Sequence, residues 1–151
     1  MSKTVTLEVH EENLARSTEE ALDLIEKNKG HIIGKILADT ARTLAPVYQG
    51  AGGGTLQASI QPIPCEREGD TVTCGFGTNV EYAVYQEYGT GYKSDCAKHT
   101  PKLYWRYKSD RDGEWHTGHP QKPRRFMRKS YAQNEKNIEN LLAGAFEEVL
   151  L

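Results

Sequence analysis

The chain has 151 residues, a hydrophobic share of 37% and a formal net charge of −2, which fits one globular domain over residues 1–151 and leaves little room for two. The small net charge gives no global sign of a nucleic-acid binder. The first residues lack the apolar core of a signal peptide, and no apolar run approaches the roughly 18 residues that would cross a membrane. We therefore expect a soluble protein made in a cytosol. Three cysteines, an odd number, argue against a disulfide framework.

Apolar residues recur at helical spacing over residues 13–44 and predict one long amphipathic helix. Ser17 and Glu20 have the spacing of a capping box, which offers a start for the regular part. The preceding residues, 1–12, are expected to form a short strand or a flexible tail. At 1.5 Å per residue the helix would be about 40 Å long. One end is therefore expected to project beyond a small sheet or to meet another subunit.

Two glycines and a proline interrupt or end this helix. Gly30 and Gly34 weaken its middle, each by about 1 kcal/mol relative to alanine, and mark a bend or a close crossing by another element. Pro46 ends the helix, because the residue before a proline is driven out of the helical region. A loop is expected at 46–55. Its glycine run favours a hinge or linker over a phosphate-binding loop, since no Lys-Ser/Thr pair follows it and no strand precedes it.

Residues 56–64 alternate between apolar and polar and predict a strand, with prolines that place its far end at a sheet edge. Residues 71–76 predict a second strand that returns after a charged turn. Cys65 and Cys74 can approach each other across this hairpin. In a cytosolic protein we expect buried thiols rather than a bridge.

The stretch 78–92 predicts a short helix with both ends defined. Thr78 and Glu81 have capping-box spacing, and Gly89 stands where a chain leaves a helix through a left-handed residue. Tyrosines recur at every third position and step round one face: Tyr82, Tyr85 and Tyr88. A tyrosine buries a large ring yet keeps a hydrated hydroxyl, which suits a protein interface. The alternative is that these rings cover a small sheet of the same domain.

Residues 91–102 are expected to be a polar loop. Segments 103–107 and 114–117 flank a turn and predict a second hairpin, with Trp105 and Trp115 close across it. From about Arg125 to Leu150, apolar residues recur at helical spacing and predict a second long amphipathic helix.

Two pairs of potential metal ligands flank the second hairpin. Such pairs often build small zinc sites, but these contain one thiolate and lie in polar segments where histidines occur by chance. We therefore expect a solvent-exposed hairpin with incidental histidines, and no metal or other cofactor. A zinc site is the alternative. The candidate ligands are Cys96, His99, His116 and His119.

The sequence contains no nucleophile elbow, no His-Glu-x-x-His run and no paired carboxylates in a catalytic frame, so we expect no enzyme. One dense basic cluster lies at the start of the last helix, where positive charge is unfavourable for the helix dipole. It faces an acidic partner surface or nucleic acid, or it is a solvated helix end. Its members are Lys122, Arg124, Arg125, Arg128 and Lys129.

Three stretches together resemble one protein family. Residues 45–46 and 54–60, AP and GTLQASI, resemble its Ala-Pro-x-x-Thr-Gly-x-Leu-x-x-Ser-Ile element. Residues 82–90, YAVYQEYGT, resemble its Tyr-Ala-x-Tyr-x-Glu-aromatic-Gly-Thr signature. Residues 123–127, PRRFM, which follow a WHTG run, resemble its Pro-x-Phe-Met/Leu start of the last helix. The family is the tail-component, or head–tail joining (tail-completion), proteins of long-tailed bacteriophages and prophages.

The resemblance implies an α+β fold in which a long N-terminal helix and a C-terminal helix pack on a small antiparallel sheet. It implies a structural subunit of a ring, commonly a hexamer, at the phage neck, in the virion after assembly in the host cytoplasm. Its partners would be copies of itself, neighbouring neck and tail-tube proteins and nearby genomic DNA, with no membrane. The glycine-rich insertion before Leu56 departs from the family pattern and leaves the geometry of that loop open. The expected interface residues are Tyr82, Tyr85, Glu87, Tyr88 and Thr90.

A second function remains open on the residues alone. It is a small zinc-stabilised module that binds nucleic acid through the basic cluster. Zinc bound by Cys96 and His119, and DNA affinity that falls steeply with salt, would distinguish this module from a virion assembly protein.

Overall fold

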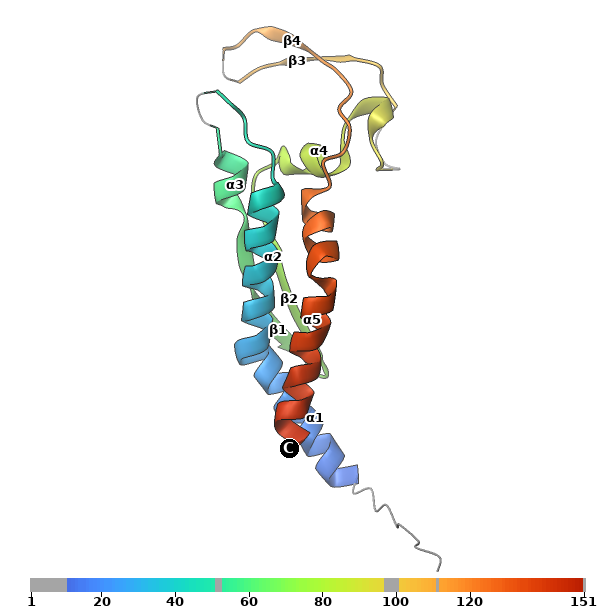
Figure 1. The fold of residues 1–151 in the computed structure, drawn as a ribbon. Helices are drawn as coiled ribbons and strands as arrows, with labels where there is room; N and C mark the ends of the chain where they lie inside the picture. Colours follow the sequence, from blue (N-terminus) through green and yellow to red (C-terminus); the bar gives the residue numbers. More distant parts are fainter. Residues whose placement is uncertain (1–10, 51–52, 97–100, 111, 151) are drawn as a thin grey trace, which may run out of the picture.

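The computed structural model describes residues 11–50, 53–96, 101–110 and 112–150, which form an α+β fold. The expected fold class is therefore confirmed. In Figure 1 the N-terminal helices and the C-terminal helix run side by side along a two-stranded sheet, and a short helix and a second hairpin lie beyond one end of them. No helix of the described part is both long and apolar enough to cross a bilayer. The elements, in order, are α1 (Glu11–Leu24), the π-helical turn η1 (Ile25–Lys29), α2 (Gly30–Leu44), α3 (Thr55–Ser59), β1 (Gln61–Glu68), β2 (Thr71–Gly77), α4 (Ala83–Tyr88), the 3-10 turn η2 (Gly91–Lys93), β3 (Trp105–Lys108), β4 (Trp115–Gly118) and α5 (Phe126–Leu150).

The predicted long N-terminal helix is present as α1, η1 and α2 in unbroken succession. It is already helical at Glu11, so Ser17 lies inside α1 and the capping box predicted there is wrong. The helix ends as predicted, because Ala45 is extended, with φ −65° and ψ 136°, before Pro46. The middle of this helix packs on α5, where Lys29 of η1 forms an ion pair with Glu148 at 3.0 Å.

Both glycines inside this helix lie where β1 and β2 cross it closely. A Cβ atom on Gly30 would overlap the sulfur atoms of Cys65 and Cys74. A Cβ atom on Gly34 would stand 2.9 Å from the carbonyl oxygen of Gly75 and 3.4 Å from the Pro62 side chain. Of the two roles predicted for these glycines, close approach by another element is therefore confirmed at both positions.

The predicted strand over residues 56–64 is partly wrong, because Thr55–Ser59 is the helix α3 and β1 begins only at Gln61. Leu56 and Ile60 are four residues apart, so a helical turn brings both into the core, where they are 2% and 0% exposed. The alternation of apolar and polar residues over 56–64 also places these two residues on one face, but of a strand. The helix follows Gly54, whose φ of 86° lies in the left-handed region.

β1 and β2 form an antiparallel hairpin that contains a register shift between Ile63 and Glu66. Next to this irregularity, Cys65 and Cys74 form a disulfide with their Cα atoms 4.3 Å apart. The prediction of two buried thiols is therefore wrong. The register of the hairpin brings the two cysteines together, and neither the number of cysteines nor the expected cellular compartment predicts this register.

Reduction of this disulfide is expected to lower the free energy of unfolding by about 2–3 kcal/mol, because the bridge closes a short loop in the unfolded chain. Thermal melts followed by circular dichroism, with and without a reductant, measure the change. Cys96, the free cysteine, provides the control: Cys96→Ser should leave the oxidised melting temperature and its drop on reduction unchanged. Equal melting temperatures before and after verified reduction would contradict the expectation.

The core has two centres along the long axis. The lower one joins Ile33 and Leu37 of α2 to Ile138 of α5. The upper one lies at the end where α4 crosses the helices and contains residues from all three family-like stretches. Its buried members are Ala38, Ala41, Ala45, Leu56, Ile60, Ala83 and Phe126. These stretches, distant in sequence, therefore build one packed unit.

Charge is segregated along the molecule. At the end formed by α1 and the C-terminal part of α5, acidic residues outnumber basic ones, and Arg67 of β1 pairs there with Glu19 and Asp23 of α1. The basic cluster lies at the opposite end, where α5 begins. The acidic side chains of that first end include Glu19, Glu20, Asp23, Glu139, Glu147 and Glu148.

Candidate functional site

We call the described residues between 78 and 125 the cap. They comprise α4, η2, β3, β4 and their connections, and they lie at the end of the molecule opposite the C-terminus (Figure 1). α4 begins only at Ala83, and Tyr82 is its N-cap without a side-chain cap bond. The Thr78 hydroxyl accepts a bond from the Val80 N–H at 3.1 Å, in the turn before the helix. The capping box predicted for Thr78 and Glu81 is therefore wrong.

Glu87 holds the cap to α5. Its side chain is 5% exposed, and its carboxylate accepts hydrogen bonds from the backbone N–H groups of Met127 at 2.9 Å and Arg128 at 3.2 Å. It also accepts a bond from Arg128 Nε at 2.8 Å. A carboxylate at these first amides of α5 offsets the unfavourable positive charge of the basic cluster. The structure thus gives Glu87, predicted as an interface residue, a role inside the subunit.

Asp95 adds a second acidic group to this junction. It pairs with Arg128 at 3.0 Å and with Arg125 at 3.0 Å. The hydrogen bond from Arg128 is the main cause that lowers the pKa of Asp95. In turn, the bonds to Asp95 and then to Glu87 raise the pKa of Arg128. Two of the five residues in the basic cluster are therefore neutralised within the chain.

The end of the tyrosine signature is fixed to the segment before α5. Thr90 donates its backbone N–H to the Gln121 carbonyl at 2.9 Å, and the Gln121 N–H donates to the Thr90 hydroxyl at 2.9 Å. Gly89 has φ 76°, and a Cβ atom there would stand 2.8 Å from the Pro123 nitrogen. Only glycine meets both conditions. Thr90, also predicted at the interface, is therefore partly buried in a contact within the chain.

The three tyrosines of the signature remain at the surface. Tyr82, Tyr85 and Tyr88 are 44%, 51% and 37% exposed, while Ala83 of the same segment is buried. They do not serve as cover for β1 and β2 in this chain. The Arg128 guanidinium lies 4.8 Å from the centre of the Tyr88 ring, which orients that ring.

The second hairpin is present, but its tryptophans do not face each other. Trp105 is opposite Gly118 and Trp115 is opposite Lys108, at the two ends of the ladder. Gly118 leaves room for the Trp105 ring, which a Cβ atom would overlap. Between this hairpin and α4 lies a groove of about 820 Å³, whose lining includes the aromatic residues Tyr82, Tyr85, Trp105 and Tyr107.

The candidate metal ligands do not form a recognisable site in the described residues. His116 shares a hydrogen bond of 2.9 Å with Asp112, and its ring stacks on Tyr107 with centroids 5.8 Å apart. His119 is exposed and Cys96 is partly buried. His99 lies outside the described residues. Among those described, no three or more His, Cys, Asp and Glu side chains gather in a metal-binding group.

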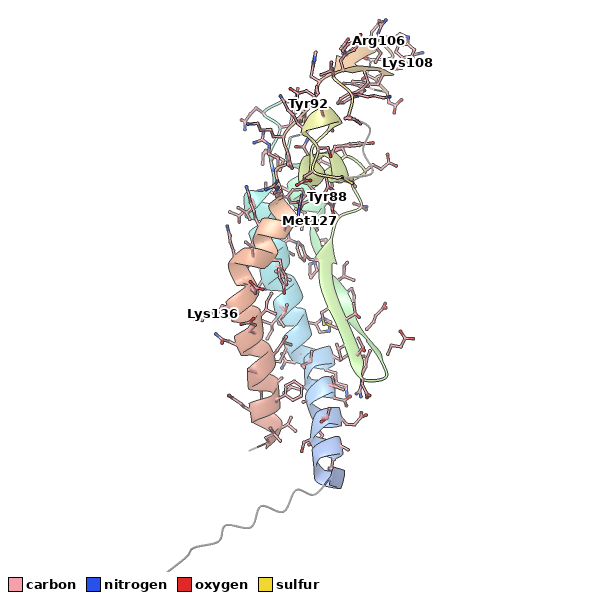
Figure 2. The ribbon with its side chains drawn as sticks, turned by 90° about the vertical axis from the view of Figure 1, so that its right-hand side faces the viewer. Tyr88, Tyr92, Arg106, Lys108, Met127 and Lys136 are labelled. Carbon is pink, nitrogen blue, oxygen red and sulfur yellow. A yellow bond between two sulfur atoms is a disulfide. The ribbon has the colours of Figure 1, made fainter. Side chains whose placement is uncertain are left out.

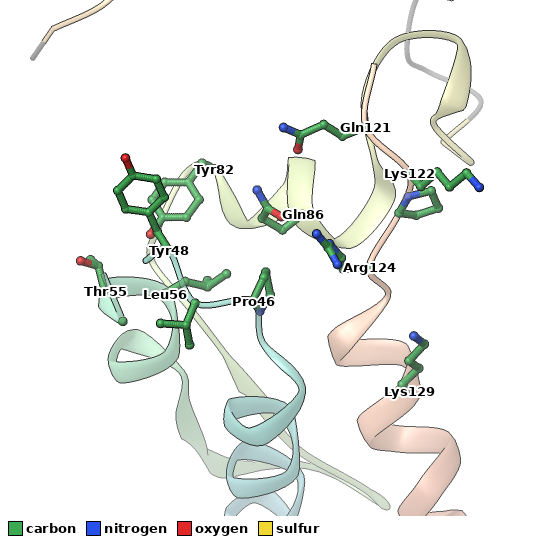
Figure 3. A pocket seen from close by; sticks show the side chains of 13 residues that line it. Pro46, Tyr48, Thr55, Leu56, Tyr82, Gln86, Gln121, Lys122, Arg124 and Lys129 are labelled. Atoms are coloured by element: carbon green, nitrogen blue, oxygen red, sulfur yellow. The ribbon is translucent and has the colours of Figure 1, made fainter. Parts of the chain in front are cut away.

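The rest of the basic cluster lines a pocket of about 1030 Å³ between the cap and the loop before α3. Figure 3 shows Lys122, Arg124 and Lys129 on one side of it, and the rings of Tyr48 and Tyr82 on the other. Sequence reasoning found the three cations but missed Tyr48, which stands outside every motif. Its position between Pro46 and a glycine run was the available signal.

In comparisons with known proteins, no family model, no curated protein and no solved structure matches this chain.

Proposed function

We propose that this protein is a structural subunit of a virion, a tail-completion or head–tail joining protein that assembles into a ring at the neck of a long-tailed phage. The proposal begins from the three sequence stretches that resemble this family. Their meeting in one core, through Ala45, Leu56, Ala83 and Phe126, supports it, because unrelated chance matches have no reason to converge in space.

The observation that carries the proposal is the exposure of the aromatic residues. All eight tyrosines of the chain are at least 37% exposed, and Trp115 is 61% exposed. Tyrosine and tryptophan are enriched at the centres of protein interfaces and depleted on surfaces that remain solvated. The surface of the cap therefore has the composition of an interface whose partner is another protein.

Rigidity of the cap favours a permanent assembly role. The tyrosine signature is anchored through Glu87 to α5 and through Thr90 to Gln121, so its rings are positioned before any partner arrives. A partner that binds preorganised side chains loses less conformational entropy. A ring requires contacts between two different faces of each subunit. Tyr88 on α4 and Trp115 at the end of the hairpin ladder are exposed outside the groove that α4 shares with the hairpin, and they offer such faces.

Native mass spectrometry of the purified chain tests the proposal, with closed rings of identical subunits as the expected species. Tyr85→Ala and Tyr88→Ala are each expected to leave a folded monomer and to weaken subunit association at least tenfold, since truncation of an interface hot spot costs about 2 kcal/mol or more. Tyr131→Ala is the matched control, because Tyr131 is 51% exposed on α5, outside the cap.

Two results would contradict the proposal. One is a wild-type chain that stays monomeric at every soluble concentration and also fails to join tails or capsids supplied to it. The other is loss of the circular dichroism signal in Tyr85→Ala and Tyr88→Ala, which would assign the rings to the fold of the subunit.

A further inference from the structure

The pocket beside α4 combines two kinds of wall. One wall consists of Lys122 and Arg124, just before α5, and Lys129, in its first turn. The other wall holds the Tyr48 and Tyr82 rings, as Figure 3 shows. Its volume of about 1030 Å³ is just above the range of about 300–1,000 Å³ that is usual for ligand sites.

The positive charge in this pocket is uncompensated. In the described part of the chain, no ion pair or hydrogen bond engages the side chains of Lys122, Arg124 and Lys129. None of the described residues that line the pocket is acidic. Their neighbours Arg125 and Arg128, by contrast, are paired with Asp95 and Glu87. The same basic cluster is thus divided into two structural cations and three that remain available to an anion.

The two rings of the pocket are accessible to solvent. Tyr48 is 64% exposed and Tyr82 is 44% exposed. The backbone of Gly50 lies directly beneath the Tyr48 ring, where a Cβ atom would overlap its carbon atoms. The backbone of Tyr82 is the N-cap of α4. Each ring can therefore contact a ligand that enters the pocket.

We propose that this pocket binds single-stranded nucleic acid, with unpaired bases against Tyr48 and Tyr82 and backbone phosphates on Lys122, Arg124 and Lys129. Aromatic rings beside a cationic wall are the usual means of binding a single strand without sequence preference. Duplex bases are stacked on each other and cannot reach rings inside a concave pocket. An acidic peptide would use the cations but would leave the two rings without a planar partner. This inference does not rest on the proposed neck function.

Fluorescence anisotropy of a labelled oligothymidylate about ten nucleotides long provides the test. Three phosphate contacts on a single strand predict a slope of about −2 for log affinity against log salt, so affinity should fall about 20-fold between about 50 and 200 mM salt. A duplex of the same length should bind at least about tenfold more weakly, because its bases remain stacked.

Two charge reversals on α5 distinguish an effect of the pocket on binding from an effect of the net charge of the protein. Lys129→Glu should weaken binding about tenfold or more, because it places a carboxylate among the phosphates. Lys136→Glu changes the net charge equally, and Lys136 is exposed on α5 away from the cap (Figure 2). It should change affinity less than about twofold. The phosphate part of the proposal is overturned if both variants lose the same affinity.

Tyrosine variants test the stacking part. Tyr48→Ala should lose about tenfold in affinity, since stacking of one base on an aromatic ring contributes about 1–3 kcal/mol, and Tyr48→Phe should keep most of it. Tyr131→Ala is the control. Circular dichroism confirms that each variant is folded. The proposal is overturned if the oligothymidylate does not bind, if the duplex binds as tightly, or if an oligoglutamate peptide competes equally well.

Discussion

Replacing Glu87 by alanine is expected to lower the free energy of unfolding by about 3–4 kcal/mol. The substitution removes the acceptor of two backbone N–H groups in the first turn of α5 and of Arg128 Nε. Loss of a buried partner from such a set leaves the remaining groups desolvated and unpaired, which costs more than the bond itself. Urea denaturation followed by circular dichroism measures the change.

Two variants assign the effect to the carboxylate of Glu87. Glu87→Gln keeps an acceptor oxygen of nearly the same shape but removes the charge, so we expect about half of the loss. Glu81→Ala removes an exposed carboxylate six residues earlier and should change stability by less than about 0.5 kcal/mol. A loss below about 1 kcal/mol for Glu87→Ala would mean that other contacts hold the cap on α5.

Phe126→Ala is the second substitution expected to have a large effect, about 3–5 kcal/mol. The Phe126 ring is fully buried, and it lies in the upper core with Leu56 and Ala83, where α3, α4 and α5 meet. Truncation removes the transfer free energy of the ring and leaves a cavity that small neighbours such as Ala83 cannot fill.

A matched control exists on the same helix. Phe146 is 39% exposed near the end of α5, so Phe146→Ala should cost about 1 kcal/mol or less. The same denaturation experiment compares the two. Equal losses would contradict the assignment of the upper core as the main anchor of the cap. Because Phe126 supports Ala83 of α4, the Phe126→Ala variant should also assemble poorly even where it remains folded.

The long elements of the fold were predictable because their patterns extend over many residues. Both long helices and the second hairpin are close to where the sequence pattern predicted them, and Pro46 ends α2 for the expected steric reason. In the first hairpin only the second strand, β2, is where it was predicted. Short segments were not predictable in this way. Leu56 and Ile60 satisfy the spacing of a helix as well as that of a strand, and only the core beneath them decides for α3. The Cys65–Cys74 bridge likewise depends on a register shift that no local pattern reveals.

The residues of the candidate site were largely predictable, but the ion pairs and hydrogen bonds between them were not. The spacing of the tyrosines gave the aromatic face, and the run of basic residues gave the cluster before α5. The sequence does not reveal, however, that Glu87 and Asp95 neutralise Arg128, or that Lys122 has no carboxylate partner among the residues that the structure describes. That division arises from contacts between residues about 30–40 positions apart, for which a single sequence carries no local signal.

The separation of charge along the molecule has a consequence for how it meets other molecules. With acidic residues such as Glu19 and Glu148 at one end and the basic cluster at the other, the chain carries an electric dipole along its long axis although its net charge is only −2. The field of a large anion exerts a torque on such a body before contact and turns the basic end toward it. Added salt shortens the range of this alignment to about 10 Å at 0.1 M. At low salt the protein therefore meets a large anion more often through its basic end than a random orientation would give.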